Sequence, residues 1–164
     1  MNDHLNWRYA TKKFDPSKKI SEQEFSQLIE ALRLSPSSFG LQPWKYVIVR
    51  NPELKKKLRA HAWDQPQITD ADAIIVFCAK KSMDESYIKN FVESISKTRG
   101  VAKESLDGYE QMMLGAIKAK APEAAIQWMK HQAYIALGGL LTECAYRKID
   151  ACPMEGFEIG RAHV

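Results

Sequence analysis

The chain has 164 residues, of which 45% are hydrophobic and 27% charged. This length suits one domain, and this composition excludes collagen-like, disordered and mucin-like chains. No apolar run reaches the roughly 18–20 residues that a membrane helix needs, and the N-terminus lacks the apolar stretch of a signal peptide. The formal net charge of +4 at pH 7 fits a mildly basic protein or one that binds nucleic acid, membrane surfaces or anionic ligands.

The three cysteines lie in apolar surroundings without a CxxC spacing; they are Cys78, Cys144 and Cys152. This pattern favours reduced, mostly buried thiols in a cytoplasmic protein over a disulfide framework or a zinc site. We therefore expect a cytoplasmic protein without a bound metal.

The predicted elements mix helices with a smaller number of strands. Capping residues and helical spacing predict helices at about residues 21–34, 52–61, 82–95, 106–120 and 122–148. A short N-terminal helix precedes Arg8, and Ser21 and Ser82 are each followed three residues later by a glutamate, which completes a capping box. β-Branched and apolar runs predict strands at 46–49, 73–79 and about 151. The order predicts an α+β fold.

Three details refine this prediction. The run at 73–79 shows no alternation, so we expect both faces of that strand to be covered. The stretch 133–141 is apolar almost all round, which predicts a buried helix, and Gly138 and Gly139 inside it suggest that another backbone packs close there. The basic run 55–59 has no interleaved aromatic residue and is interpreted as a solvated helix face.

Residues 8–15 place three cations within six positions: Arg8, Lys12 and Lys13. Arginine offers a planar fork of donors and lysine a point charge, so one interpretation is an anion clamp for a phosphate or an electron-rich ring. The alternative is a basic helix end that complements its own dipole. The spacing alone favours the helix end.

The segment 35–44 reads SPSSFGLQPW, and the segment 153–157 reads PMEGF. Serine hydroxyls, free amides and a glycine in the first suit a polar ligand held by a loop, whereas a plain helix-to-strand connection explains the same residues. A turn in the second could present backbone N–H groups to a ligand. Each of these segments taken alone is a weak signal.

Together the segments resemble the FMN-dependent nitroreductase family, in its oxygen-insensitive NAD(P)H nitroreductase and dihydropteridine reductase branch. The matching motifs, in order, are RYATKKFD, SPSSFGLQPW, DAIIVFCA, QWMKHQ and CPMEGF, and they cover Asn6 to Phe157. The resemblance implies a mainly antiparallel central sheet flanked by helices. It also implies an intertwined homodimer with flavin at the interface.

The resemblance also implies the residues that bind FMN. Arg8 would hold the phosphate, and Lys12 would approach the N1–O2 side of the ring, where reduced flavin is negative. The predicted cofactor-binding residues are Arg8, Tyr9, Ala10, Lys12, Pro36, Ser37, Ser38, Gly40, Asp64, Gln65, Gln132, Pro153, Met154, Glu155 and Gly156. Those of the serine loop would reach the partner's flavin, and Gly40 replaces an asparagine common in close relatives. No side chain is assigned a catalytic role, because the flavin carries the chemistry.

The implied reaction is ping-pong: NADH or NADPH passes a hydride to flavin N5, and a nitroaromatic, quinone or related acceptor is then reduced by two electrons. Alternatives on the same scaffold are flavin, enone and dehalogenating reductases. A remote alternative of a different class is a non-enzymatic basic binding module, which would bind nucleic acid and no flavin. For the enzyme we expect neither nucleic acid nor a membrane as a partner.

After Phe157 the resemblance stops. Members of the family continue with a helix, a strand and an arm that closes over the FMN phosphate. Residues 159–164 match a translated sequencing-library adapter. We therefore expect an incomplete domain at residues 1–158 and a non-native read-through tail at 159–164.

Overall fold

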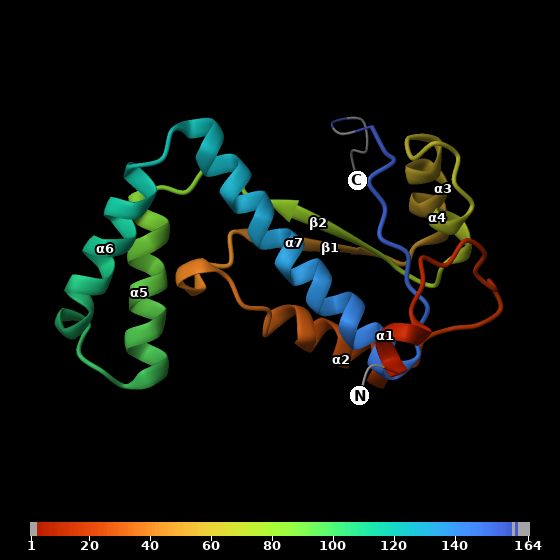
Figure 1. The fold of residues 1–164 in the computed structure, drawn as a ribbon, viewed down its shortest axis with the longest axis horizontal. Helices are drawn as coiled ribbons and strands as arrows, with labels where there is room; N and C mark the ends of the chain where they lie inside the picture. The colour runs from red at the N-terminus through yellow and green to blue at the C-terminus, as the bar shows by residue number, and fades with distance from the viewer. Residues whose placement is uncertain (1–2, 159, 161–164) are drawn as a thin grey trace. The chain divides into compact units, whose positions relative to one another are not determined.

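The structure is a computed structural model that describes residues 3–158 and 160. Within these residues, seven α-helices and two strands follow in chain order (Figure 1): α1 (Asp3–Trp7), α2 (Glu22–Arg33), β1 (Trp44–Val49), α3 (Pro52–Ala60), α4 (Gln67–Asp70), β2 (Ile74–Ala79), α5 (Glu85–Arg99), α6 (Asp107–Lys118) and α7 (Pro122–Arg147). Short 3-10 turns occupy Ser38–Gly40 and Lys103–Leu106. The prediction of a helix-rich α+β fold is confirmed.

The two strands form one antiparallel sheet. The N–H of Lys80, just after β2, donates to the Pro43 carbonyl, just before β1. The end of one strand therefore lies beside the start of the other. Every residue of β2 keeps partial exposure, so the expectation that both faces of this strand are covered is wrong within the described chain, where the sheet has a single partner strand.

The chain divides into two compact units. The first takes in the residues up to Ser35, the segment Tyr46–Phe77 and the chain from Ala136 onward. Its core is built on Leu28 and Leu32 of α2, which pack with Leu140 and Cys144 of α7. Burial raises the pKa of the Cys144 thiol to about 11, so this cysteine is an inert core residue.

The second unit comprises Pro36–Lys45 and Cys78–Ile135. Its core joins Leu41 of the serine loop to Ile88 and Val92 of α5 and to Met113 and Leu114 of α6. Helices α5 and α6 run side by side in Figure 1 and make direct contact. The serine loop is thus packed against the same two helices that form this unit's core.

Local signals located most helix ends. The Ser21 hydroxyl accepts from Glu24 N–H, and the Glu24 carboxylate accepts from Ser21 N–H, so the predicted capping box of α2 is confirmed. The second predicted box is wrong: α5 begins at Glu85 with Asp84 as its N-cap. The strand expected near Ala151 is reduced to one parallel bridge with Ala10.

Two further expectations are corrected. Lys55 is only 5% exposed, and its ammonium donates to the Ala71 carbonyl at 2.5 Å, so the basic run 55–59 is not wholly a solvated face. Burial, together with the nearby Lys19, lowers the pKa of Lys55.

The expected close approach of another backbone to Gly138 and Gly139 is the second correction. A methyl group built on Gly138 would meet no described atom within 4 Å, and one on Gly139 would meet only the Ser35 hydroxyl, at 3.7 Å. No described backbone therefore packs close at these glycines.

Within the described residues, no helix has the length and hydropathy to cross a bilayer. The three cysteines are free thiols, and Cys144 alone among them is buried. No group of metal-ligating side chains comes together in the described part of the chain. The proposed tail at 159–164 lies outside the described residues, apart from Gly160.

Candidate functional site

The basic segment after α1 is fixed by its middle residue. Thr11 is 1% exposed, its hydroxyl donates to Asp150 Oδ1 at 3.1 Å, and its N–H donates to the Ala151 carbonyl at 3.3 Å. Ala10 forms the parallel bridge to Ala151. These contacts join the start of the chain to the segment that runs into the PMEGF motif.

The cations Arg8 and Lys12 lie on the segment that Thr11 anchors. Lys12 is exposed and Arg8 is half-buried, and neither side chain has a hydrogen bond or ion pair with any residue that the structure describes. By contrast, Arg50 and Arg59 are paired with carboxylates. A pair of cations held on an anchored segment without an internal carboxylate partner is available to an external anion.

The segment 153–156 contacts the turn that follows α3. The Gln65 side-chain amide donates to the Gly156 carbonyl at 3.0 Å. A methyl group on Gly156 would lie 2.6 Å from Cε3 of Trp63, so the absence of a side chain allows this indole to pack against the backbone. Trp63 and Asp64 both have positive φ angles, of 53° and 50°, a conformation that non-glycine residues adopt rarely.

The two cofactor-binding residues predicted in this turn, Asp64 and Gln65, already have hydrogen-bond partners within the chain. Asp64 accepts a hydrogen bond from Arg59 Nε at 2.7 Å, so its carboxylate already has a partner. The side-chain amide of Gln65 donates to two backbone carbonyls, those of Ala62 and Gly156. The structure therefore gives Gln65 a role in holding the 153–156 segment.

The serine loop is held in a strained conformation. Phe39 and Gln42 have φ angles of 57° and 44°, and Gly40 has φ 71°. The Ser37 hydroxyl accepts from Gln42 N–H at 2.8 Å, which steadies the loop. A left-handed residue 40 suits glycine, and asparagine tolerates the same conformation, so the replacement of an asparagine by Gly40 keeps the backbone path.

Gln132 of α7 is 6% exposed and reaches this loop. Its Oε1 accepts from Ser38 N–H at 2.8 Å, and its Nε2 donates to the Trp128 carbonyl at 3.1 Å. Gln132, predicted as a residue that contacts the flavin, is thus joined to the serine loop by a direct hydrogen bond, a contact that the sequence did not predict. The Ser38 hydroxyl itself has no partner among the described residues.

The predicted cofactor residues fall into two sets, each within one unit. In the first unit, contacts join the segment 8–12 to 150–151 and the turn 61–65 to 156 and 158. Pro153 and Glu155 are exposed there and Met154 is half-buried, and Tyr9 is 60% exposed. In the second unit, Ser38 and Gln132 are hydrogen-bonded, and Pro36, Ser37 and Gly40 lie in the same loop.

Four residues that support this arrangement were not predicted from the sequence: Thr11, Arg59, Trp63 and Asp150. Thr11 lies three residues after Arg8 and directly before Lys12, and this spacing was a signal. Threonine favours extended backbone, in which successive side chains alternate between two faces, so Thr11 could face the opposite way from both cations. The other three carried no local signal.

A family model described as "Nitroreductase family" matches residues 5–164. The relative named "Putative NAD(P)H nitroreductase YfkO", from Bacillus subtilis (strain 168), is 35% identical over 168 residues, which cover 98% of this chain and 76% of the relative. Twenty-five curated relatives match this chain significantly.

Solved structures agree on the fold. A "putative nitroreductase in complex with FMN" from Exiguobacterium sibiricum 255-15 superposes with a TM-score of 0.81 at 23% identity, covering 98% of this chain and 78% of that one. CLA-ER, an enone reductase of gut-bacterial fatty acid saturation metabolism, gives the same TM-score and identity, with 98% and 77% covered. The predicted fold is confirmed by these likenesses. The chain belongs to the nitroreductase family and is an oxidoreductase.

Proposed function

We propose that the protein is an FMN-containing oxidoreductase that takes electrons from NADH or NADPH and reduces nitroaromatics, quinones or related acceptors in a ping-pong cycle. The observation that carries this proposal is the pair of cations at Arg8 and Lys12, which lie on an anchored segment and have no partner among the described residues. FMN offers a phosphate and a ring that becomes negative on reduction, so this donor set fits it.

FMN, when bound, supplies hydride acceptance and two-electron delivery, chemistry that no side chain possesses. The chain's own residues would bind FMN and orient its ring. Arg8 would bind the phosphate, and Lys12 would stabilise negative charge on the ring. Ser37 and Ser38 would offer hydroxyl donors, and the Gln132 amide fixes Ser38 by accepting its N–H.

The segment 153–156 would lie against the ring and present backbone N–H groups, as its motif implies. Gln65 and Trp63 hold this segment at Gly156. We keep Tyr9, Ala10, Pro36, Gly40 and Asp64 in the proposed site, with Asp64 the least available because of its bond to Arg59.

We further propose a homodimer with flavin at the interface, located in the cytoplasm, whose other partner is the small-molecule acceptor. The exposed apolar side chains of α7 support the dimer, and the free thiols support a reducing compartment.

The test of the cofactor is direct. The protein purified after expression with riboflavin should be yellow, and NADH or NADPH should bleach it without oxygen. Arg8→Gln should weaken FMN binding by about tenfold or more, because a hydrogen bond to a charged group contributes about 1.5–3 kcal/mol. Lys13→Gln is the matched control: it removes the same charge from an exposed neighbour and should leave the FMN dissociation constant within about twofold.

A colourless protein that retains nucleic acid in a salt-sensitive complex would instead identify the basic binding module.

For a protein that does hold flavin, a panel of electron acceptors distinguishes the reactions that the same scaffold could catalyse. It should contain nitroaromatics, quinones, free flavin, halogenated aromatics and enones, the last because CLA-ER shares the fold. Equal loss of FMN affinity in Arg8→Gln and Lys13→Gln would contradict the assigned phosphate contact.

A further inference from the structure

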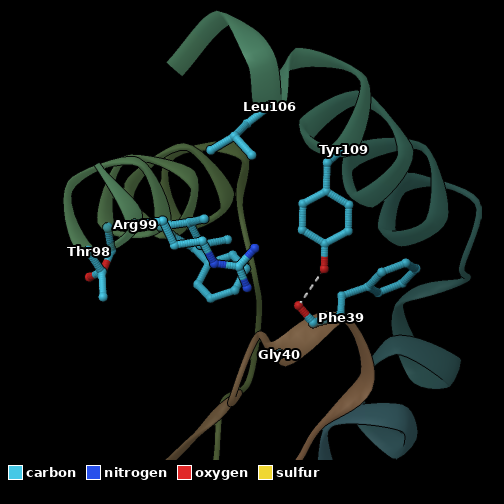
Figure 2. A pocket seen from close by; sticks show the side chains of 9 residues that line it. Phe39, Gly40, Thr98, Arg99, Leu106 and Tyr109 are labelled. Carbon is cyan, nitrogen blue, oxygen red and sulfur yellow. Dashed lines mark hydrogen bonds between the residues drawn. The ribbon is translucent and has the colours of Figure 1, made fainter. Parts of the chain in front are cut away.

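The second unit contains a pocket of about 640 Å³ between α5, the start of α6 and the serine loop. Figure 2 shows it from close by. This volume lies within the range of small-molecule sites, about 300–1,000 Å³. The side chains that give it chemical character are Phe39, Phe91, Ser94, Thr98, Arg99 and Tyr109.

The aromatic wall of this pocket is held in place. The Tyr109 hydroxyl donates to the Phe39 carbonyl at 2.8 Å, as Figure 2 shows with a dashed line. The two rings meet edge to face, with centroids 6.4 Å apart. Phe39 has a φ of 57°, so this hydrogen bond stabilises a backbone conformation that a phenylalanine seldom adopts. The wall is therefore preformed for a flat apolar ligand.

The α5 side of the pocket is a single helix face. Ser94, Thr98 and Arg99 follow Phe91 at spacings of three, seven and eight residues, which places them on one stripe of the helix. Two hydroxyl side chains and one guanidinium thus line the same pocket as the aromatic wall. A flat ligand held between these surfaces would meet polar donors along one side.

Arg99 gives the pocket its charge. Among the described residues, no aspartate or glutamate lines the pocket, and the Arg99 guanidinium has no ion pair with any of them. Figure 2 shows the side chain extending from α5 toward the middle of the pocket. A cation in the last turn of a helix also complements the helix dipole, but that role does not require it to reach into a pocket.

We propose that this pocket binds planar aromatic carboxylates, with the ring against Phe39 and Tyr109 and the carboxylate on the Arg99 fork. Guanidinium and carboxylate match as planar, two-point partners. The pocket shares Phe39 and Gly40 with the loop that carries Ser37 and Ser38, so a nitro group on the bound ring is the electron acceptor: two electrons from NAD(P)H, passed through the flavin, and two protons convert it into a nitroso group and water. That last step rests on the proposed function, whereas the binding itself does not.

The experiment measures equilibrium binding by calorimetry, without NADH or NADPH. It compares 4-nitrobenzoate with 4-nitrobenzamide, which has the same ring and nitro group but no charge. Arg99→Gln should weaken 4-nitrobenzoate binding about tenfold and leave 4-nitrobenzamide within twofold. Lys103→Gln is the matched control, because Lys103 is an exposed cation nearby that does not line the pocket, and it should change neither affinity. Arg99→Lys should recover part of the loss.

A second variant locates the ligand. Thr98→Trp would fill the pocket from an exposed helix position and should abolish binding of both compounds, while the circular dichroism spectrum stays unchanged. The proposal is overturned if Arg99→Gln affects both compounds equally, if Lys103→Gln matches it, or if Thr98→Trp leaves binding intact.

Turnover distinguishes this proposal from the function that precedes it. If NAD(P)H is oxidised, Arg99→Gln should raise KM for 4-nitrobenzoate about tenfold with little change in kcat. If the protein holds no flavin but still discriminates the two compounds through Arg99, the carboxylate site stands and only its role as an acceptor site is overturned.

Discussion

Thr11 is the residue on which the proposed phosphate contact depends, because it anchors the segment that carries Arg8 and Lys12. Replacing Thr11 with valine keeps the shape of the side chain and removes the hydrogen bond to Asp150. We expect the free energy of unfolding to fall by about 1 kcal/mol and FMN affinity to fall with it. Denaturant unfolding and an FMN titration check both effects.

The matched control is Thr142→Val. Thr142 is exposed, and its hydroxyl donates only to the Gly138 carbonyl of its own helix. That substitution should change stability by less than about 0.5 kcal/mol. Equal effects of the two variants would show that Thr11 acts through helix or strand propensity and not as an anchor.

Tyr109 makes a second prediction at the scale of one residue. Tyr109→Phe removes the donor to the Phe39 carbonyl and should cost about 1 kcal/mol in stability. It should also weaken 4-nitrobenzamide binding, because the aromatic wall loses its fixed position. Tyr146→Phe is the control, since Tyr146 is 64% exposed and packs against the ring of His4 instead. An unchanged affinity in Tyr109→Phe would contradict a preformed wall.

At the scale of elements, α5 depends on the carboxylate of Asp84. This carboxylate accepts from Tyr87 N–H at 2.9 Å and from the Ser86 hydroxyl at 2.8 Å, and these bonds hold the pKa of Asp84 below its usual value of 3.8. A carboxyl whose folded pKa is lowered stabilises the fold above its unfolded pKa and loses that contribution as pH falls through the folded pKa.

Asp84→Asn keeps a good N-cap without the titration. The stability advantage of the native protein over this variant should therefore be constant at neutral pH and shrink below about pH 4. Thermal unfolding of both proteins from pH 7 to pH 3 measures it, because the other carboxyls titrate alike in both. An advantage that does not change with pH would contradict the assigned role of the charge.

Elements whose signals are local were predictable from the sequence. The capping box and apolar spacing gave α2 within one residue at each end, and Pro122 marked the start of α7. The start of α5 was not predictable from the sequence, because Ser82 and Asp84 are both good N-cap residues. Tertiary contacts decide between them: Met83 packs on the core of its unit, and the Lys80 N–H pairs with the Pro43 carbonyl.

The candidate site, too, was predictable only where its signals are local in the sequence. Its residue types and motif order pointed to the family, which the comparisons show. The contacts that hold the site, Thr11 to Asp150 and Ser38 to Gln132, join positions 139 and 94 residues apart. Such pairings have no local pattern, because they form only when distant elements pack. The carbonyls and amides that each side chain meets were therefore beyond prediction.

At the scale of the whole molecule, α7 exposes apolar side chains in its middle. Its central stretch was expected to be buried on all sides, yet Tyr134 is 54% exposed and Ile135 is 47% exposed. Nothing described approaches Gly138. We propose that a second copy of the chain covers these exposed apolar side chains of α7, which is the arrangement that the proposed interface flavin requires.

Ile135→Lys tests this arrangement. A lysine in the middle of an apolar interface would lose its hydration without gaining a partner, so we expect light scattering to show the mass of a dimer for the native protein and that of a monomer for the variant at micromolar concentration. FMN affinity should fall together with dimerisation, because residues of both copies would hold the flavin. Val101→Lys is the control: Val101 is 39% exposed and lies in the loop after α5, so the same substitution there should leave the dimer and its flavin unchanged. A native protein that remains monomeric while it binds FMN tightly would contradict the interface site and confine the flavin to a single chain.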